Sequence, residues 1–220
     1  MKILLINTAG SEGSVALADT GFAQPIVATA ALPGRTSSEQ LVPTVRQLLE
    51  GRGWNLNELG AVVVVHGPGS FTGIRVGLSA AKGLSEAAGV PLVAVSQLAL
   101  LAASADGGGK PVHAVFDAGR REFYYGKYLG RQRLEEALLS GKDLVTRIGE
   151  GIVVACESKV AATLGIAPQM VAEPLAGDAL PFALERIEAN DFDDVATLDA
   201  NYLRRSDAEI FAKPGVRAVS

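Results

Sequence analysis

The sequence has one cysteine and two histidines among its 220 residues. A single cysteine excludes an internal disulfide. We interpret Cys156, which follows the apolar "GIVVA", as a small buried hydrophobe rather than a reactive thiol. The histidines, His66 and His113, lie 47 positions apart, and neither follows the spacing of a metal-ligand motif. No metal site is therefore expected on this chain.

Basic residues and long apolar runs are also scarce. There are 20 Lys and Arg against 24 Asp and Glu, a net charge of -4. Because phosphate contacts dominate nucleic-acid affinity, the chain is not expected to bind RNA alone, and an RNA surface shared with a partner stays open. No apolar run approaches the ~18–20 residues that span a bilayer. The start "MKILLIN" turns polar too soon for a signal peptide, so we expect a cytoplasmic protein.

The first half of the sequence predicts a mixed sheet with helices packed on it. "KILLINTA", "GSVALAD" and "PIVATAA", punctuated by glycines, predict an antiparallel meander. A helix follows, in which Pro43 predicts a bend or a later start. "LGAVVVVHG" is continuously apolar, which indicates a strand covered on both faces. A glycine loop, a helix, the strand "PLVAVS" and the helix "QLALLAAS" complete the pattern.

The stretch "ADGGGKP", residues 105–111, is the best candidate domain boundary. Beyond it "VHAVFDAGRREFYYGKYLG" predicts two strands around a turn at residues 118–121. The strand "GIVVA" and the helices "ESKVAATLG" and "DALPFALERIEAN" follow. The second half therefore repeats the order of the first in shorter form.

The stretch "HGPGSFTGIRVGLSAAKGL", residues 66–84, raises the question of phosphate binding, which glycine loops that open helices often perform. A P-loop needs Lys and Ser or Thr after its last glycine, but Gly73 precedes Ile74 and Arg75. The dinucleotide fingerprint needs a glycine where Thr72 stands. We interpret the loop as a tight strand-to-helix turn capped by Ser70 or Thr72. Its structural residues are Gly67, Gly69, Ser70, Thr72 and Gly73.

The helix after this loop carries small residues on two faces. Gly73, Gly77, Ala80 and Leu84 share one face, and the neighbouring face is a candidate partner interface. Close packing on the chain's own sheet and docking of a partner both stay open. A cation in the first turn opposes the helix dipole, so Arg75 is expected to pair with a carboxylate of this chain or of a partner. The predicted interface residues are Arg75, Val76, Ala80, Gly83 and Ala87.

A dense charged cluster lies in the second half. Two interpretations stay open: a solvated hairpin turn, or a patch that faces a partner subunit or tRNA with the help of Lys127, Arg131 and Arg133. The cluster consists of Asp117, Arg120, Arg121 and Glu122.

Nearly the whole chain resembles one family. "GPGSFTGIRVGLSAAKGL", "KILLINTAGSEGSVAL", "SSEQLVPTVRQLLE", "FDAGRREFYYGKY" and "NYLRR" are similar to the TsaB (YeaZ) family, the non-catalytic subunits of bacterial tRNA threonylcarbamoyladenosine synthesis. The resemblance implies an α/β actin-like ATPase (ASKHA) fold with two related domains of mixed sheet flanked by helices. The expected domains are 1–105, rejoined by the segment 201–220, and the smaller 106–200.

The resemblance also implies a function. Such proteins act with the catalytic subunit TsaD and the ATPase TsaE, in an assembly that transfers threonylcarbamoyl to the adenosine beside the anticodon of tRNAs reading A-starting codons. ATP and metal are then expected on the partner subunits, with no cofactor on this chain alone. tRNA is expected only within the complex, and a homodimer of the isolated chain stays open.

Two departures from the family pattern bear on the alternatives. Asn7-Thr8-Ala9 replaces the usual Asp-Thr-Ser, and an amide is a poor magnesium ligand. "TSSEQLVPTV" lacks the metal-binding histidine pair of the catalytic relatives. An independent ATP-using enzyme, suggested by the glycine-rich turn at residues 9–13, is the second hypothesis, and Asn7 argues against it. A metallopeptidase is excluded by the histidine count.

Overall fold

The first half of the chain forms a mixed five-stranded sheet. The computed structural model describes residues 1–33 and 37–203. Its first strands are β1 (Lys2–Asn7), β2 (Gly13–Asp19), β3 (Ile26–Leu32), β4 (Leu59–Val65) and β5 (Leu92–Val95). They lie in the order β3-β2-β1-β4-β5. The β1–β2–β3 meander is antiparallel, whereas β4 pairs in parallel with β1 and β5.

The second half repeats this arrangement. Its strands are β6 (Val112–Gly119), β7 (Glu122–Leu129), β8 (Gln132–Ser140), β9 (Ile152–Ala155) and β10 (Gln169–Met170). Their order is β10-β9-β6-β7-β8, again an antiparallel meander with parallel strands beside its first member. The repeated order predicted from the sequence is therefore confirmed at the level of topology.

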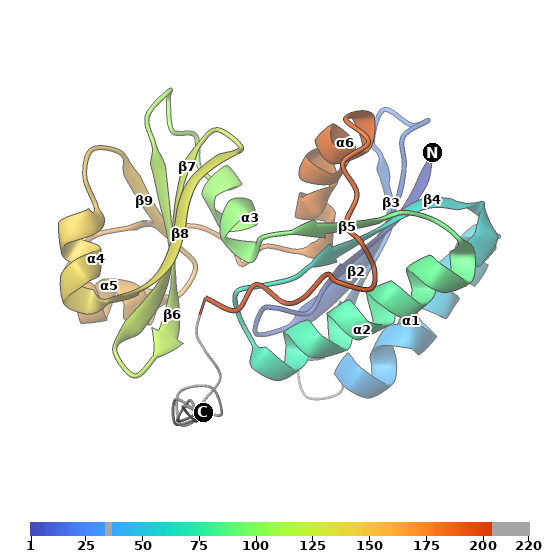
Figure 1. Cartoon of the computed structure of the whole chain (residues 1–220), viewed down its shortest axis with the longest axis horizontal. Coiled ribbons are helices and arrows are strands. Elements are labelled where there is room, and N and C mark those ends of the chain that lie inside the picture. The colour runs from blue at the N-terminus through green and yellow to red at the C-terminus, as the bar shows by residue number, and fades with distance from the viewer. Residues whose placement is uncertain (34–36, 204–220) are drawn as a thin grey trace, which may run out of the picture.

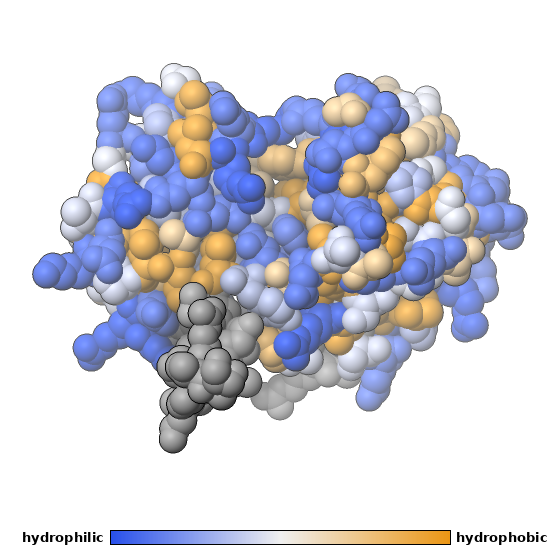
Figure 2. Space-filling view, in the orientation of Figure 1, coloured by the Kyte–Doolittle hydropathy of each residue, from blue (hydrophilic) through white to orange (hydrophobic). Residues whose placement is uncertain are grey.

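Helices cover both sheets (Figure 1). In the first half α1 and α2 lie on one face and α6 on the other, whereas α3 lies between the two sheets and α4 and α5 cover the outer face of the second. A notch separates the two halves at one edge in the space-filling view (Figure 2). The helices are α1 (Ser37–Arg52), α2 (Phe71–Ala88), α3 (Gln97–Ala103), α4 (Gly141–Arg147), α5 (Ser158–Leu164) and α6 (Leu180–Glu188). Two short 3-10 turns are η2 (Leu56–Glu58) and η3 (Ala176–Ala179).

The position of β4 between β1 and β5 explains its continuously apolar sequence. Every residue from 61 to 65 is buried, because α2 packs on one face of the sheet and η3 approaches the other. The sequence of a strand that is covered on both faces is typically a continuous apolar run. In the neighbouring α1, Pro43 lies inside the helix, which begins at Ser37, so the later start that this proline suggested is wrong.

The chain returns from the second half to the first through a crossing segment, residues 171–176. Val171 N donates to the Ala155 carbonyl of β9 at 3.0 Å, and Ala176 N donates to Ser14 Oγ of β2 at 2.8 Å. η3 and α6 then pack into the core of the first half. The return comes well before the expected boundary at residue 200, and residues 204–220 of the expected rejoining segment lie outside the described residues.

Candidate functional site

The glycine loop (residues 66–70) packs its backbone against the β1–β2 turn. Ser70 N donates to the Ala9 carbonyl at 2.8 Å. A Cβ atom at Gly69 would come well inside 3.0 Å of the same carbonyl oxygen, a distance that real Cβ atoms essentially never reach. Gly67 has a φ of 108°, which favours glycine. Ser70 Oγ accepts from Gly73 N at 3.3 Å, so Ser70 rather than Thr72 is the N-cap, and the predicted strand-to-helix corner is confirmed.

The first turns of α2 lie directly against the end of β1. A Cβ atom at Gly73 would overlap the Thr8 carbonyl oxygen, and one at Gly77 would overlap Thr8 Oγ1. Thr8 Oγ1 in turn donates to the Gly73 carbonyl at 2.7 Å. These two glycines therefore serve close packing within the chain, the first of the two roles considered for the small residues of this helix.

The opposite side of α2 is open. Arg75, Gly83 and Ala87 are exposed, and apart from the adjacent helix backbone no atom of the described residues lies within 4 Å of a Cβ built on Gly83. Val76 and Ala80 are instead half-buried against the core of the first half. The five predicted interface residues thus do not form one uniform surface, because only Arg75, Gly83 and Ala87 face outward.

Arg75 belongs to an exposed aromatic cluster. Its Nε donates to the Tyr202 hydroxyl at 2.7 Å, and its guanidinium lies 3.8 Å from the Phe71 ring centroid. Phe71 and Tyr202 remain 49% and 38% exposed. The expected carboxylate is not found among the described residues, where aromatic faces stabilise the cation instead. Exposed aromatics with arginine are typical of the residues that dominate binding energy at protein interfaces.

Asn7 organises the junction of three segments. It is buried, and its Nδ2 donates to Gln97 Oε1 at 3.0 Å and to the Pro174 carbonyl at 2.9 Å. Its Oδ1 accepts from Ala9 N at 3.0 Å. An ionised aspartate could not donate to either acceptor, so the position is fitted to an amide. The departure from the family pattern therefore has a structural role in this chain.

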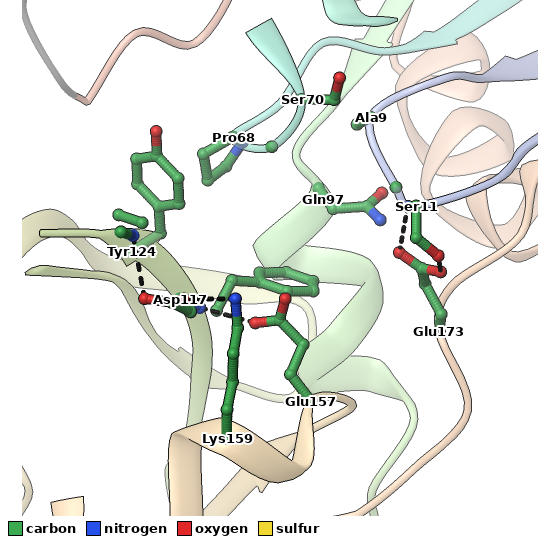
Figure 3. A pocket seen from close by; sticks show the side chains of 15 residues that line it. Ala9, Ser11, Pro68, Ser70, Gln97, Asp117, Tyr124, Glu157, Lys159 and Glu173 are labelled. Atoms are coloured by element: carbon green, nitrogen blue, oxygen red, sulfur yellow. Dashed lines mark hydrogen bonds and ion pairs between the residues drawn. The ribbon is translucent and has the colours of Figure 1, made fainter. Parts of the chain in front are cut away.

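A pocket of about 370 Å³ lies beside this junction, lined by the β1–β2 turn, the glycine loop and the β6–β7 hairpin (Figure 3). On the hairpin side, Asp117 pairs with Lys159 at 2.5 Å and its backbone N donates to Glu157 Oε2 at 2.7 Å. On the turn side, Glu173 accepts from Ser11. No sequence pattern pointed to Glu173, since it lies in "VAEPLAG", a stretch without a recognisable motif.

The charged cluster of the second half is divided by the structure. Arg120 and Arg121 form the β6–β7 turn, with φ angles of 56° and 64°, and both are exposed. Arg131 and Arg133 lie at the β7–β8 turn, at the opposite end of β7. The side chains of Arg131 and Arg133 therefore do not extend the cluster at the β6–β7 turn, whereas the contact of that turn with a partner or with tRNA stays a prediction.

Neither histidine lies in a group of metal ligands; in the described ranges no three His, Cys, Asp or Glu side chains could hold a metal ion. His113 is fully buried, with Nδ1 2.9 Å from the Tyr125 hydroxyl and Nε2 3.2 Å from the Glu150 carbonyl. Desolvation lowers the pKa of His113, and burial lowers that of His66 in the same way. His113 therefore has a structural role.

The lowered pKa of His113 predicts a loss of stability in acid. Below the ordinary value of 6.5 the unfolded chain binds the proton more readily than the folded one, so the contribution present at neutral pH is lost as pH falls. We expect the melting temperature to fall less between pH 7 and pH 5 in His113→Gln than in the wild type. An equal fall in melting temperature in the two proteins would contradict this role of His113. Both proteins contain His66, so its titration does not affect the comparison.

Cys156 is half-buried beside the core of the second half. Desolvation raises the pKa of its thiol to about 12, so the thiol stays protonated at neutral pH and is a weak nucleophile. This agrees with its interpretation as a small hydrophobe. Across residues 1–33 and 37–203, no helix has the length and apolar character needed to cross a membrane.

Comparison with known proteins places these features in a family. A family model described as TsaD, tRNA N6-adenosine threonylcarbamoyltransferase, matches residues 30–169, more than half of the chain. The chain belongs to this family. It resembles the tRNA threonylcarbamoyladenosine biosynthesis protein TsaB of Escherichia coli, with 35% identity over 145 residues. The TsaB of Bacillus subtilis is 32% identical over 147 residues.

These alignments cover 65% and 66% of this chain but only 60% and 62% of the two TsaB proteins. A crystal structure from Pseudomonas aeruginosa, described as similar to the peptidase YeaZ, matches more completely. It has a TM-score of 0.78 and 26% identity, with coverage of 92% of this chain and 99% of that one. The resemblance to TsaB (YeaZ) and the actin-like fold of two mixed sheets flanked by helices, both expected from the sequence, are confirmed.

Proposed function

We propose that this chain is a non-catalytic partner subunit in the synthesis of threonylcarbamoyladenosine in tRNA. It acts with the catalytic subunit TsaD and the ATPase TsaE and is required for the transfer of threonylcarbamoyl to the adenosine beside the anticodon of tRNAs reading A-starting codons. Its similarity to two TsaB biosynthesis proteins supports this role. tRNA modification is also in keeping with the cytoplasmic location expected from the sequence.

The end of β1 is the observation that carries the non-catalytic assignment. Asn7 stands where the family usually has an aspartate. Its side-chain amide forms hydrogen bonds with Gln97, the Pro174 carbonyl and Ala9 N. A neutral amide that donates twice within the fold is unsuited to holding magnesium beside a nucleotide. We therefore assign ATP and metal to the partner subunits and no cofactor to this chain.

The open face of α2 supports a role in binding a partner. It presents the aromatic cluster of Phe71, Arg75 and Tyr202 at one end and the open surface over Gly83 farther along. In isolation the same face is available to a second copy of the chain. With a net charge of -4, the chain gains little from counterion release, so tRNA is held only within the complex.

The transfer reaction tests this function. Purified TsaD and TsaE are incubated with unmodified tRNA and the threonylcarbamoyl donor, with and without this chain, and modified adenosine is quantified by mass spectrometry. We expect modification in the complete mixture and only background when this chain is left out or is supplied alone. Full modification without it, or modification by this chain alone, would refute the non-catalytic partner role.

A further inference from the structure

Glu136 is a buried carboxylate at the junction of the two halves. Its side chain is 4% exposed, although β8, the strand that carries it, is exposed or half-buried along its length. Ser96 Oγ, which caps α3, donates to Glu136 Oε1 at 2.5 Å, and the Tyr128 hydroxyl of β7 donates to the same oxygen. A buried charge needs hydrogen bonds or opposite charges to offset its loss of water, and these two hydroxyls supply part of that stabilisation.

The other carboxylate oxygen of Glu136 binds the last described segment, residues 199–203. Asn201 Nδ2 donates to Glu136 Oε2 at 2.7 Å, whereas the exposed guanidinium of Arg133 lies 3.9 Å from that oxygen. Asn201 N donates to the His66 carbonyl at 2.9 Å, at the end of β4. The first half thus holds the backbone of the segment, and β8 of the second half holds the side-chain amide. Figure 1 shows the chain after α6 crossing from the first sheet toward the second.

The residue after Asn201 completes the aromatic cluster on α2. The Tyr202 hydroxyl accepts from Arg75 Nε at 2.7 Å, and the Tyr202 ring centroid lies 5.8 Å from that of Phe71. Tyr202 belongs to no helix or strand, so its position depends on the contacts that the neighbouring residues of its segment make. The hydrogen bond between Asn201 and Glu136 therefore connects β8 to a surface on the other half of the chain.

We propose that Glu136 is a positioning residue for the partner-binding face of α2: through Asn201 it fixes where Tyr202 lies beside Arg75. The inference rests on the proposed function, since it takes the aromatic cluster to bind the catalytic subunit. Glu136 itself is buried and lies outside that cluster. The affinity for the partner then depends on a contact between the two halves, and not only on the residues that face the partner.

Exchanging the two bonded groups tests the proposal. Asn201→Asp keeps the size of the side chain but places a second carboxylate against Glu136, and the two like charges repel. We expect calorimetry to show binding to TsaD at least roughly tenfold weaker than that of the wild type. Adding Glu136→Gln restores one donor and one acceptor to the pair and is expected to return the affinity toward the wild-type value. Asn190→Asp, the same substitution at an exposed position beyond α6, is the control and should bind as the wild type does.

Two further measurements separate positioning of Tyr202 from a general loss of structure. In a chain that already carries Tyr202→Ala, Asn201→Asp should weaken binding no further, because the ring that it displaces is absent. The nuclear magnetic resonance signal of the Arg75 Nε–H should shift in Asn201→Asp, with no partner present. It should return toward its wild-type position when Glu136→Gln is added.

The position of Tyr202 and the binding of a partner can fail separately. The proposal is overturned if Asn201→Asp binds TsaD as tightly as the wild type, or if it weakens binding equally with and without the Tyr202 ring. It is also overturned if the Arg75 signal does not move. Absence of binding by the wild-type chain would instead refute the proposed function, and the Arg75 signal would still decide whether Glu136 places Tyr202.

Discussion

Replacing Gly73 by alanine is expected to lower the free energy of unfolding by about 3 kcal/mol or more. The added Cβ would overlap the Thr8 carbonyl oxygen, which belongs to the backbone and cannot rotate away. Relief requires that the start of α2 move off the end of β1. That shift would also break the hydrogen bond from Thr8 Oγ1 to the Gly73 carbonyl.

Gly83→Ala in the same helix is the matched control. Apart from the adjacent helix backbone, nothing in the described residues lies within 4 Å of a Cβ there, and alanine is favoured over glycine in helix interiors by up to ~1 kcal/mol. Thermal unfolding should show a large loss for Gly73→Ala and no loss, or a gain, for Gly83→Ala. One kcal/mol corresponds to about 2–4 °C in a chain of this size. Equal melting temperatures would refute the close approach of α2 to β1.

Gly83→Glu is expected to weaken association with the catalytic subunit strongly while leaving the chain folded. Gly83 lies on the open face of α2, so the new carboxylate would be solvated in the free chain. Buried without a partner in an interface, such a charge typically costs ~3–5 kcal/mol. At ~1.4 kcal/mol per tenfold, the affinity should fall by roughly 10²–10³-fold.

The control for this variant is Gly149→Glu, which adds the same charge to an open position of the second half. It should bind the catalytic subunit as the wild type does. Ala80→Glu is a poorer test, because Ala80 packs against the core and its substitution would reduce folding stability as well. A lower melting temperature of Gly83→Glu would show that the outer face of α2 is not free in the monomer.

The features that could be predicted from the sequence are those with a strong local pattern. The apolar run of β4 indicates a strand covered on both faces, and the failed nucleotide motifs point to a structural corner at residues 66–70. The turn between β6 and β7 also follows from its sequence. Each of these depends on neighbours within one element or one turn.

Other elements have no such pattern. β8 is exposed or half-buried along its whole length. Because neither of its faces is fully buried, its sequence lacks the alternation of apolar and polar residues that marks a half-buried strand. α4 spans only seven residues, of which Leu144 is the buried one, and β10 spans two. Short or half-exposed elements are stabilised by packing against the sheet that they join. A pattern within one segment of sequence does not contain this information.

The contacts of the pocket could not be predicted because they join distant positions. Ser11 and Glu173 are 162 residues apart, and Asn7 and the Pro174 carbonyl are 167 apart. The departure at Asn7 was visible in the sequence as the loss of a carboxylate. Its structural role depends on the crossing segment, whose path only the fold reveals.

A chain that acts by binding a catalytic subunit should bind purified TsaD, and calorimetric titration of TsaD with the folded chain measures this binding. We predict saturable binding by the wild type and by Gly149→Glu, and binding at least roughly 10²-fold weaker by Gly83→Glu at an unchanged or higher melting temperature. Absence of saturable binding by the wild-type chain would rule out a role as a partner subunit of TsaD.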